Sequence, residues 1–189
     1  MEIAERYELY ITQKAELKIK IEKLTDSIST KEYKQKKLGE KIKLSIEQYA
    51  LDLLKNDLNR EVGFKEATSL DINFYDNSIY VDDKKKKFSA SSEFYLKNTA
   101  RFSLFFSSLD IERMRFPRFI LSDNMEDKGI EKVRAQNFQR LIIKKANESI
   151  NKDFQIIYTT SFIPEELEGS SYCVGDFYSE ENGRKSLDI

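Results

Sequence analysis

Histidine is absent from this sequence of 189 residues, and cysteine occurs only once. Without histidine the chain has no imidazole to serve as a general base, a proton shuttle or a metal ligand. Its one cysteine, Cys173, cannot form a disulfide within the chain, and without histidine a structural zinc site is excluded as well. Any bound metal must therefore be a hard cation held by oxygen atoms, and Mg²⁺ is the leading candidate. Because a lone cysteine is typical of a reducing compartment, we expect a cytoplasmic protein.

Three further features are missing. No apolar run is long enough to span a membrane, and the first residues, MEIAERYELY, do not form a signal peptide, so we expect no membrane association. With only two prolines there is no Pro/Gly-rich linker, and none of the six glycines opens a G-x-x-x-x-G-K-[ST] phosphate-binding loop. The charges nearly balance, with Lys+Arg 32 against Asp+Glu 33, so only a local patch could attract nucleic acid.

A heptad pattern occupies the first quarter of the chain and predicts a coiled-coil arm segment over residues 1–58. Its seam alternates spacings of four and three and includes Ile3, Tyr7, Tyr10, Leu17, Ile21, Leu24, Ile28, Leu38, Ile42 and Tyr49. The pattern weakens over residues 29–35, and Gly39 follows, so either a continuous helix or a helical hairpin fits. Such a helix needs a partner helix from this chain, a second copy or another segment; the alternative is a long helix packed on its own domain.

The pattern of residues 59–189 predicts a separate α/β lobe. Two short strands flank a turn at Asp76 and Asn77, and a helix is expected over about 91–113 with one apolar face. An apolar strand at 119–121, a helix near 130–150 and a second strand at 154–160 follow, which predicts parallel pairing of the two strands. The tail predicts a hairpin that turns at Asn182 and Gly183.

Three segments of this lobe, in this order, carry a family resemblance. They are FSASSE at 88–93, which opens a helix, RFILSDN at 118–124, which ends a strand on Asp123 and Asn124, and YTTS at 158–161. Their order resembles the C-terminal half of an ABC-type ATPase head of the SMC/SbcC/RecN kind. The serine loop is similar to the signature loop, the strand end to Walker B, residues 124–134 to the D-loop region, and Thr159-Thr160 to the switch. The resemblance implies an α/β fold class, the C-terminal lobe of a P-loop ABC/SMC-type head preceded by a long coiled-coil helix.

The resemblance also implies roles for individual residues. Ser89, Ser91 or Ser92 would contact the γ-phosphate of ATP held by the opposite subunit, and Thr160 would sense it in place of the family's histidine. A polar strand end that hydrogen-bonds to backbone explains Thr159-Thr160 equally well. A serine-rich helix cap explains the same loop without any ligand. Asp123 would hold Mg²⁺, whereas a plain turn into the next helix is the simpler explanation of Asp123 and Asn124.

The position after the Walker B aspartate normally carries a glutamate that activates water, and here it is Asn124. An amide can orient water but cannot accept its proton. Either hydrolysis is slow, or Glu126 or Asp127 supplies the carboxylate, and Glu126 is the preferred candidate.

Because the phosphate-binding loop is missing, the chain is expected to be the C-terminal part of a larger ATPase or its split partner. Its partners would be the N-terminal half of that ATPase, a second head in a homodimer, and DNA. Lys84, Lys85, Lys86 and Lys87 are candidate DNA contacts, although such a run is also an ordinary solvated turn. Two other functions are open: a non-catalytic coiled-coil interaction module with a vestigial ATPase lobe, and a nuclease-like carboxylate site at Asp123, Glu126 and Asp127. The nuclease ranks last, because one turn cannot spread three carboxylates around two metals.

Overall fold

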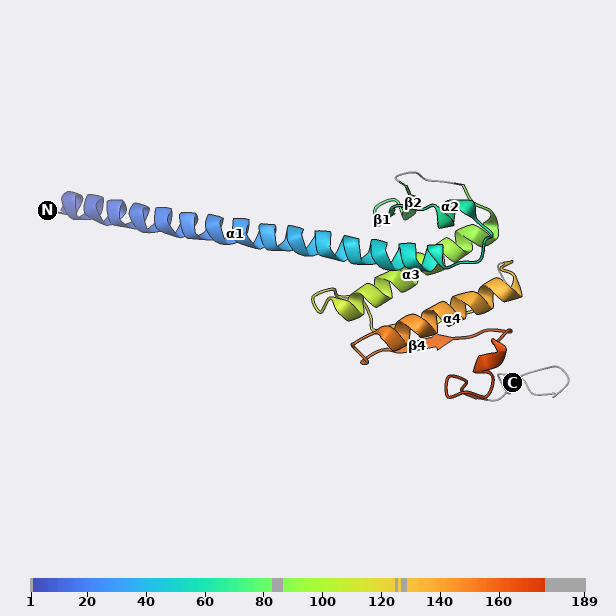
Figure 1. The fold of residues 1–189 in the computed structure, drawn as a ribbon. Helices are drawn as coiled ribbons and strands as arrows, with labels where there is room; N and C mark the ends of the chain where they lie inside the picture. Colours follow the sequence, from blue (N-terminus) through green and yellow to red (C-terminus); the bar gives the residue numbers. More distant parts are fainter. Residues whose placement is uncertain (1, 83–86, 125, 127–128, 176–189) are drawn as a thin grey trace, which may run out of the picture.

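A computed structural model describes residues 2–82, 87–124, 126 and 129–175. The fold is mixed α/β, and a single long helix projects from a small lobe (Figure 1). The predicted hairpin at Asn182 and Gly183 lies outside the described residues. The elements are α1 (Glu2–Lys55), α2 (Val62–Lys65), β1 (Leu70–Asn73), β2 (Ser78–Val81), α3 (Ala90–Asp110), β3 (Phe119–Ser122), α4 (Lys132–Glu148), β4 (Gln155–Tyr158) and the short 3₁₀ helix η2 (Glu165–Leu167).

The helix α1 is continuous through the stretch where the heptad pattern weakens. Its 54 residues extend roughly 80 Å at 1.5 Å per residue. The hydroxyls of Thr25 and Ser29 donate to the carbonyls four residues earlier, at 2.9 and 3.0 Å, and good helix formers follow them. The chain therefore does not turn back here, and the hairpin alternative is wrong. Within the described part of the chain, no helix is both long and apolar enough to cross a membrane.

Only the last turns of α1 enter the core. Ile46, Ala50, Leu53 and Leu54 are buried, whereas the seam residues from Ile3 to Ile28 are exposed. Ile21 and Leu24, for example, are each 63% exposed. The projecting part of α1 thus carries an apolar stripe that nothing in the described chain covers.

The β1–β2 hairpin confirms the predicted pair of strands. The strands are antiparallel, with Leu70 opposite Val81 and Asn73 opposite Ser78. Asn77 in the turn has a φ of 52°, the left-handed conformation that asparagine tolerates. Buried Leu70 and Val81 attach the hairpin to the core.

The helix α3 lies at the centre of the lobe, between α1 and α4 (Figure 1). It is buried around most of its circumference, so the predicted single apolar face is too narrow. The helix ends at Asp110, three residues before the predicted end near residue 113. Phe138 of α4 packs edge-on against Tyr95 and Phe102 of α3, with ring centroids 5.0 and 5.5 Å apart. Aromatic contacts of this kind join the two helices.

The strands β3 and β4 pair in parallel, as the sequence predicts, with Phe119 opposite Gln155 and Ser122 opposite Tyr158. On the inner face Ile120 and Ser122 are buried. The helix α4 lies along β4 (Figure 1). On the outer face Phe119 is 48%, Leu121 53% and Ile157 39% exposed. Parallel sheets are normally covered on both faces, so an open apolar face on a parallel pair is unusual.

Candidate functional site

The carboxyl ends of β3 and β4 bring together residues that are far apart in the sequence. The Thr159 hydroxyl donates to the Asp123 carboxylate, and the backbone N–H of Asn124 donates to the same hydroxyl at 3.4 Å. The Thr159 N–H in turn donates to the carbonyl of Ser122 at 2.9 Å, which continues the parallel ladder. Asp123 remains exposed to solvent, so its position after the strand holds a carboxylate where a ligand can reach it.

Thr160 makes a similar contact one residue further on. Its hydroxyl donates to the Glu126 carboxylate, and the side-chain amide of Gln139 donates to Thr160 Oγ1 and to the Phe162 carbonyl, both at 3.0 Å. The structure therefore places the predicted water-activating residue and the predicted switch residue side by side. Gln139 lies on α4 and is buried, and its hydrogen bond orients the Thr160 hydroxyl.

Several buried polar atoms at these strand ends have no hydrogen-bond partner among the described residues. They are the Ser122 hydroxyl, the Asn124 side-chain carbonyl, Glu126 Oε2 and the Tyr158 hydroxyl. Burial raises the pKa of Tyr158 well above its usual value, and the nearby charge of Glu126 raises it further. Buried polar atoms are normally paired, so four unpaired polar atoms at the ends of two adjacent strands are unusual.

The serine loop caps α3. The Ser89 hydroxyl accepts from the backbone N–H of Ser92 at 3.3 Å, and the hydroxyls of Ser89 and Ser91 are also 3.3 Å apart. The capping function expected for such a loop is therefore confirmed. It does not exclude a ligand, because the first N–H groups of a helix also favour an anion.

These serines line a polar pocket of about 180 Å³. Its wall consists of Arg60, Ser89, Ser91, Ser92, Gly129, Glu131 and Arg134. Gly129 belongs to the segment that follows β3, so the pocket joins the serine loop to the D-loop-like region. A larger, open hollow of about 570 Å³ between α1 and the end of α3 contains none of the predicted site residues.

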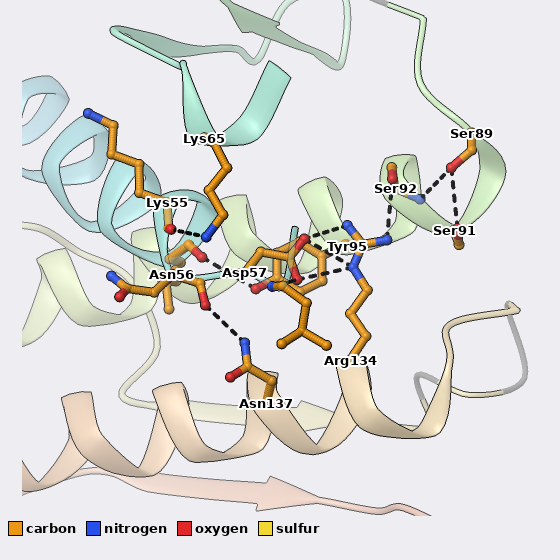
Figure 2. A network of polar contacts seen from close by, with 12 residues as sticks. Lys55, Asn56, Asp57, Lys65, Ser89, Ser91, Ser92, Tyr95, Arg134 and Asn137 are labelled. Atoms are coloured by element: carbon orange, nitrogen blue, oxygen red, sulfur yellow. Dashed lines mark hydrogen bonds and ion pairs between the residues drawn. The ribbon is translucent and has the colours of Figure 1, made fainter. Parts of the chain in front are cut away.

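Figure 2 shows a charged pair behind the serine loop that the sequence did not indicate. Arg134 and Asp57 form a buried ion pair with Nη2 and Oδ2 2.6 Å apart, and Arg134 Nη1 donates to Ser92 Oγ at 3.3 Å. Asp57 and Arg134 are 77 residues apart in the chain. The sequence around each residue is that of an ordinary surface polar residue, so no local pattern marks the two as a buried ion pair.

The predicted magnesium position has a limited set of protein ligands. Among the residues described, no group of three or more His, Cys, Asp or Glu side chains is arranged to hold a metal ion. A nuclease-like cluster therefore has no support there, although Asp127 lies outside the described residues. One strand-end carboxylate fits a Mg²⁺ ion held mainly by water and phosphate oxygens, which is how Mg²⁺ is usually bound beside nucleotides.

Of the predicted DNA-contacting lysines, Lys84, Lys85 and Lys86 lie outside the described residues, and Lys87 is exposed immediately before the serine loop.

Comparison with known proteins gave no match to a family model, a curated protein or a solved structure.

Proposed function

We propose that this chain is the C-terminal half of an SMC-like ATPase head. It would bind ATP and Mg²⁺ at an interface between two heads once another segment supplies the phosphate-binding loop. The observation that carries the proposal is the meeting of Asp123 with Thr159, and of Glu126 with Thr160, at the carboxyl ends of two parallel strands. In α/β folds ligands bind at this edge of the sheet.

The position of the serine loop supports the same proposed nucleotide site. The start of α3, the start of α4 and the carboxyl end of β4 all lie at one end of the lobe (Figure 1). The pocket at the serine loop also includes Gly129 from the segment after β3. A nucleotide at this end would therefore meet both the helix N-terminus, which favours a phosphate, and the strand-end carboxylates.

The open sheet supports the need for a second segment. A parallel pair with exposed Phe119, Leu121 and Ile157 on its outer face is incomplete as a folding unit. The N-terminal half of the same ATPase is the partner we propose for it, since that half would also bring the missing phosphate-binding loop.

The chemistry assigned to the chain's own residues is limited to holding charge and moving a proton. Asp123 would hold Mg²⁺, which neutralises phosphate charge when bound. Asn124 cannot accept a proton, so Glu126 is the residue proposed to take one from the attacking water. One oxygen of Glu126 accepts from Thr160, and the other is buried without a hydrogen-bond partner among the described residues.

On this proposal the projecting part of α1 forms a coiled-coil arm, two heads dimerise over ATP, and the assembly acts on DNA in the cytoplasm. Lys84, Lys85, Lys86 and Lys87 precede the serine loop and are the proposed contacts with DNA phosphates.

The first test is ATP binding and turnover by the chain alone and together with the segment encoded upstream of it. We expect activity only in the mixture. Asp123→Ala should abolish turnover, and Glu126→Gln should lower it by about a hundredfold or more while ATP still binds.

Asp153→Ala is the matched control. Asp153 is also a solvent-exposed aspartate beside this sheet, but it precedes β4 at the opposite end. Turnover unaffected by Asp123→Ala, or equally reduced by Asp153→Ala, would contradict the proposed site.

A non-catalytic coiled-coil interaction module is the second candidate. The exposed apolar stripe of α1 favours it, because Ile21, Leu24 and Ile28 are each more than half exposed in a helix that needs a partner. Absence of nucleotide binding in both samples would select this function over the first.

A further inference from the structure

Arg134 is buried and contacts Asp57, Ser92 and two aromatic rings, although it lies in the first turn of α4. Only 3% of its side chain is exposed, and none of the side chain of Asp57. Its guanidinium donates from Nε to both carboxylate oxygens of Asp57, at 3.1 and 3.0 Å, and from Nη2 at 2.6 Å. The guanidinium carbon also lies 4.6 Å from the ring centroid of Tyr95 and 5.9 Å from that of Phe64. A planar fork packed in this way has one orientation.

In that orientation the Arg134 guanidinium occupies one lone pair of the Ser92 hydroxyl oxygen. Arginine has no acceptor, so Ser92 Oγ must accept the hydrogen bond from Arg134 Nη1. No other hydrogen bond of this hydroxyl is present within the described part of the chain. Its own hydrogen is therefore available to donate. Ser92 lies at the start of α3 beside Arg134 (Figure 2) and lines the polar pocket there. Ser92 and Arg134 are buried and Ser89 is exposed, so the first two form the base of the pocket and Ser89 its rim.

The same network reaches the end of α1. Asp57 follows α1 by two residues, and its carboxylate also accepts from the N–H of Leu58 at 2.8 Å. Two more contacts hold this end of the helix: the Tyr95 hydroxyl donates to the Leu53 carbonyl at 3.3 Å, and the Asn137 amide to the Asn56 carbonyl at 2.9 Å. Arg134 thus connects the base of the arm to the serine loop through continuous hydrogen bonds.

We infer that Arg134 is a positioning residue that fixes Ser92 as an oriented hydrogen-bond donor at the base of this pocket, and that Asp57 makes this orientation depend on the end of α1. The ligand it would serve is a phosphate group, and this part of the inference rests on the proposed function. Among the three serines, Ser92 is then the one whose hydroxyl contacts the phosphate.

The first experiment needs no nucleotide and measures amide hydrogen exchange over residues 89–96 of the chain. Arg134→Lys retains the charge but loses the fork, and we expect exchange in the first turn of α3 to become about tenfold faster, as for the loss of one buried charged hydrogen bond. Asp57→Asn should have the same effect although Asp57 does not contact Ser92. Arg140→Lys is the control, because Arg140 also lies on α4 but pairs with the exposed Glu166.

Exchange that stays within twofold of wild type in Arg134→Lys and Asp57→Asn would overturn the inference. If these single variants do not fold, the double variant Asp57→Leu/Arg134→Met replaces the buried pair by apolar side chains of similar volume. Faster exchange over 89–96 in that variant would support the inference, and unchanged exchange would overturn it.

The second experiment measures ATP turnover by the completed head. We expect Ser92→Ala and Arg134→Lys to lower turnover by similar factors, and their combination to lower it no further than either alone. Multiplicative losses would indicate that Arg134 acts only on stability. If the wild-type head has no turnover, the proposed function fails while the exchange result still decides the positioning role.

Discussion

Among single residues, the candidate site residues that the sequence predicts one by one are joined into hydrogen-bonded pairs in the structure. Asp123 and Glu126 each accept a hydrogen bond from one of two consecutive threonines, so the strand end and the switch position form one unit. A second pair, Arg140 and Glu166, joins α4 to η2 at the surface. The hydrogen bond from Arg140 is the main reason why the pKa of Glu166 is lowered from 4.5 to about 2.

This pair gives a pH prediction. A carboxyl group whose pKa is lowered by folding stabilises the folded state above its unfolded pKa, near 4.5, and loses that contribution as the pH falls through about 2. In a carbon NMR titration we expect the Glu166 carboxylate to protonate near pH 2, and in Arg140→Gln near its ordinary value. Lys144→Gln, on the same helix, is the control and should leave the titration of Glu166 unchanged. A midpoint near 4.5 in the wild-type chain would contradict the predicted pairing.

At the scale of elements, two apolar surfaces lack a cover within the described chain. One is the stripe along the projecting part of α1, and the other is the outer face of the β3–β4 pair. Both are explained if the elements that pack on them belong to another segment, because apolar area buried at such a contact contributes about 25 cal/mol per Å².

Leu121→Lys tests the outer face of the sheet. The lysine places a charge at a position that is 53% exposed in this chain, so the chain should fold and be more soluble. Burying that charge under the proposed second segment would be unfavourable, so we expect at least a tenfold loss of affinity for that segment, measured by calorimetry.

Tyr75→Lys serves as the control, because Tyr75 is fully exposed in the turn of the β1–β2 hairpin, away from this sheet. Equal affinities for Leu121→Lys and wild type would exclude this face as the docking surface.

At the scale of the whole molecule, one hydrophobic core joins the end of α1, the hairpin, α3, α4 and β3. Phe138 lies at its centre, fully buried between Tyr95 and Phe102. Because one cluster connects the arm to the sheet, the lobe should unfold as a unit.

Phe138→Ala should lower the free energy of unfolding by about 3–5 kcal/mol in urea denaturation, since it leaves a cavity in a closely packed core. Val133→Ala, on the same helix but 56% exposed, should change it by less than about 0.5 kcal/mol. Two separate transitions, or a small effect of Phe138→Ala, would show that the α4 and β3–β4 layer is not coupled to the rest.

Features with a local period or a local turn signal can be predicted from the sequence alone. The heptad spacing specifies a long helix, alternating residues around Asn77 specify the hairpin, and two short apolar strands around a helix specify parallel pairing. The sequence also placed Asp123 at the carboxyl end of the first of these strands, the edge of an α/β sheet where ligands bind.

Features that depend on contacts between distant segments become visible only in the folded chain. Thr160 holds Glu126 across 34 residues, and Arg134 holds Asp57 across 77. Neither pairing leaves a periodic trace, since a charged residue in the first turn of a helix is usually solvated. The burial of α3 on nearly all sides is equally a property of its neighbours α1 and α4. Periodicity records which face of an element is apolar, whereas partner choice is set by packing and by the free energy of burying a charge.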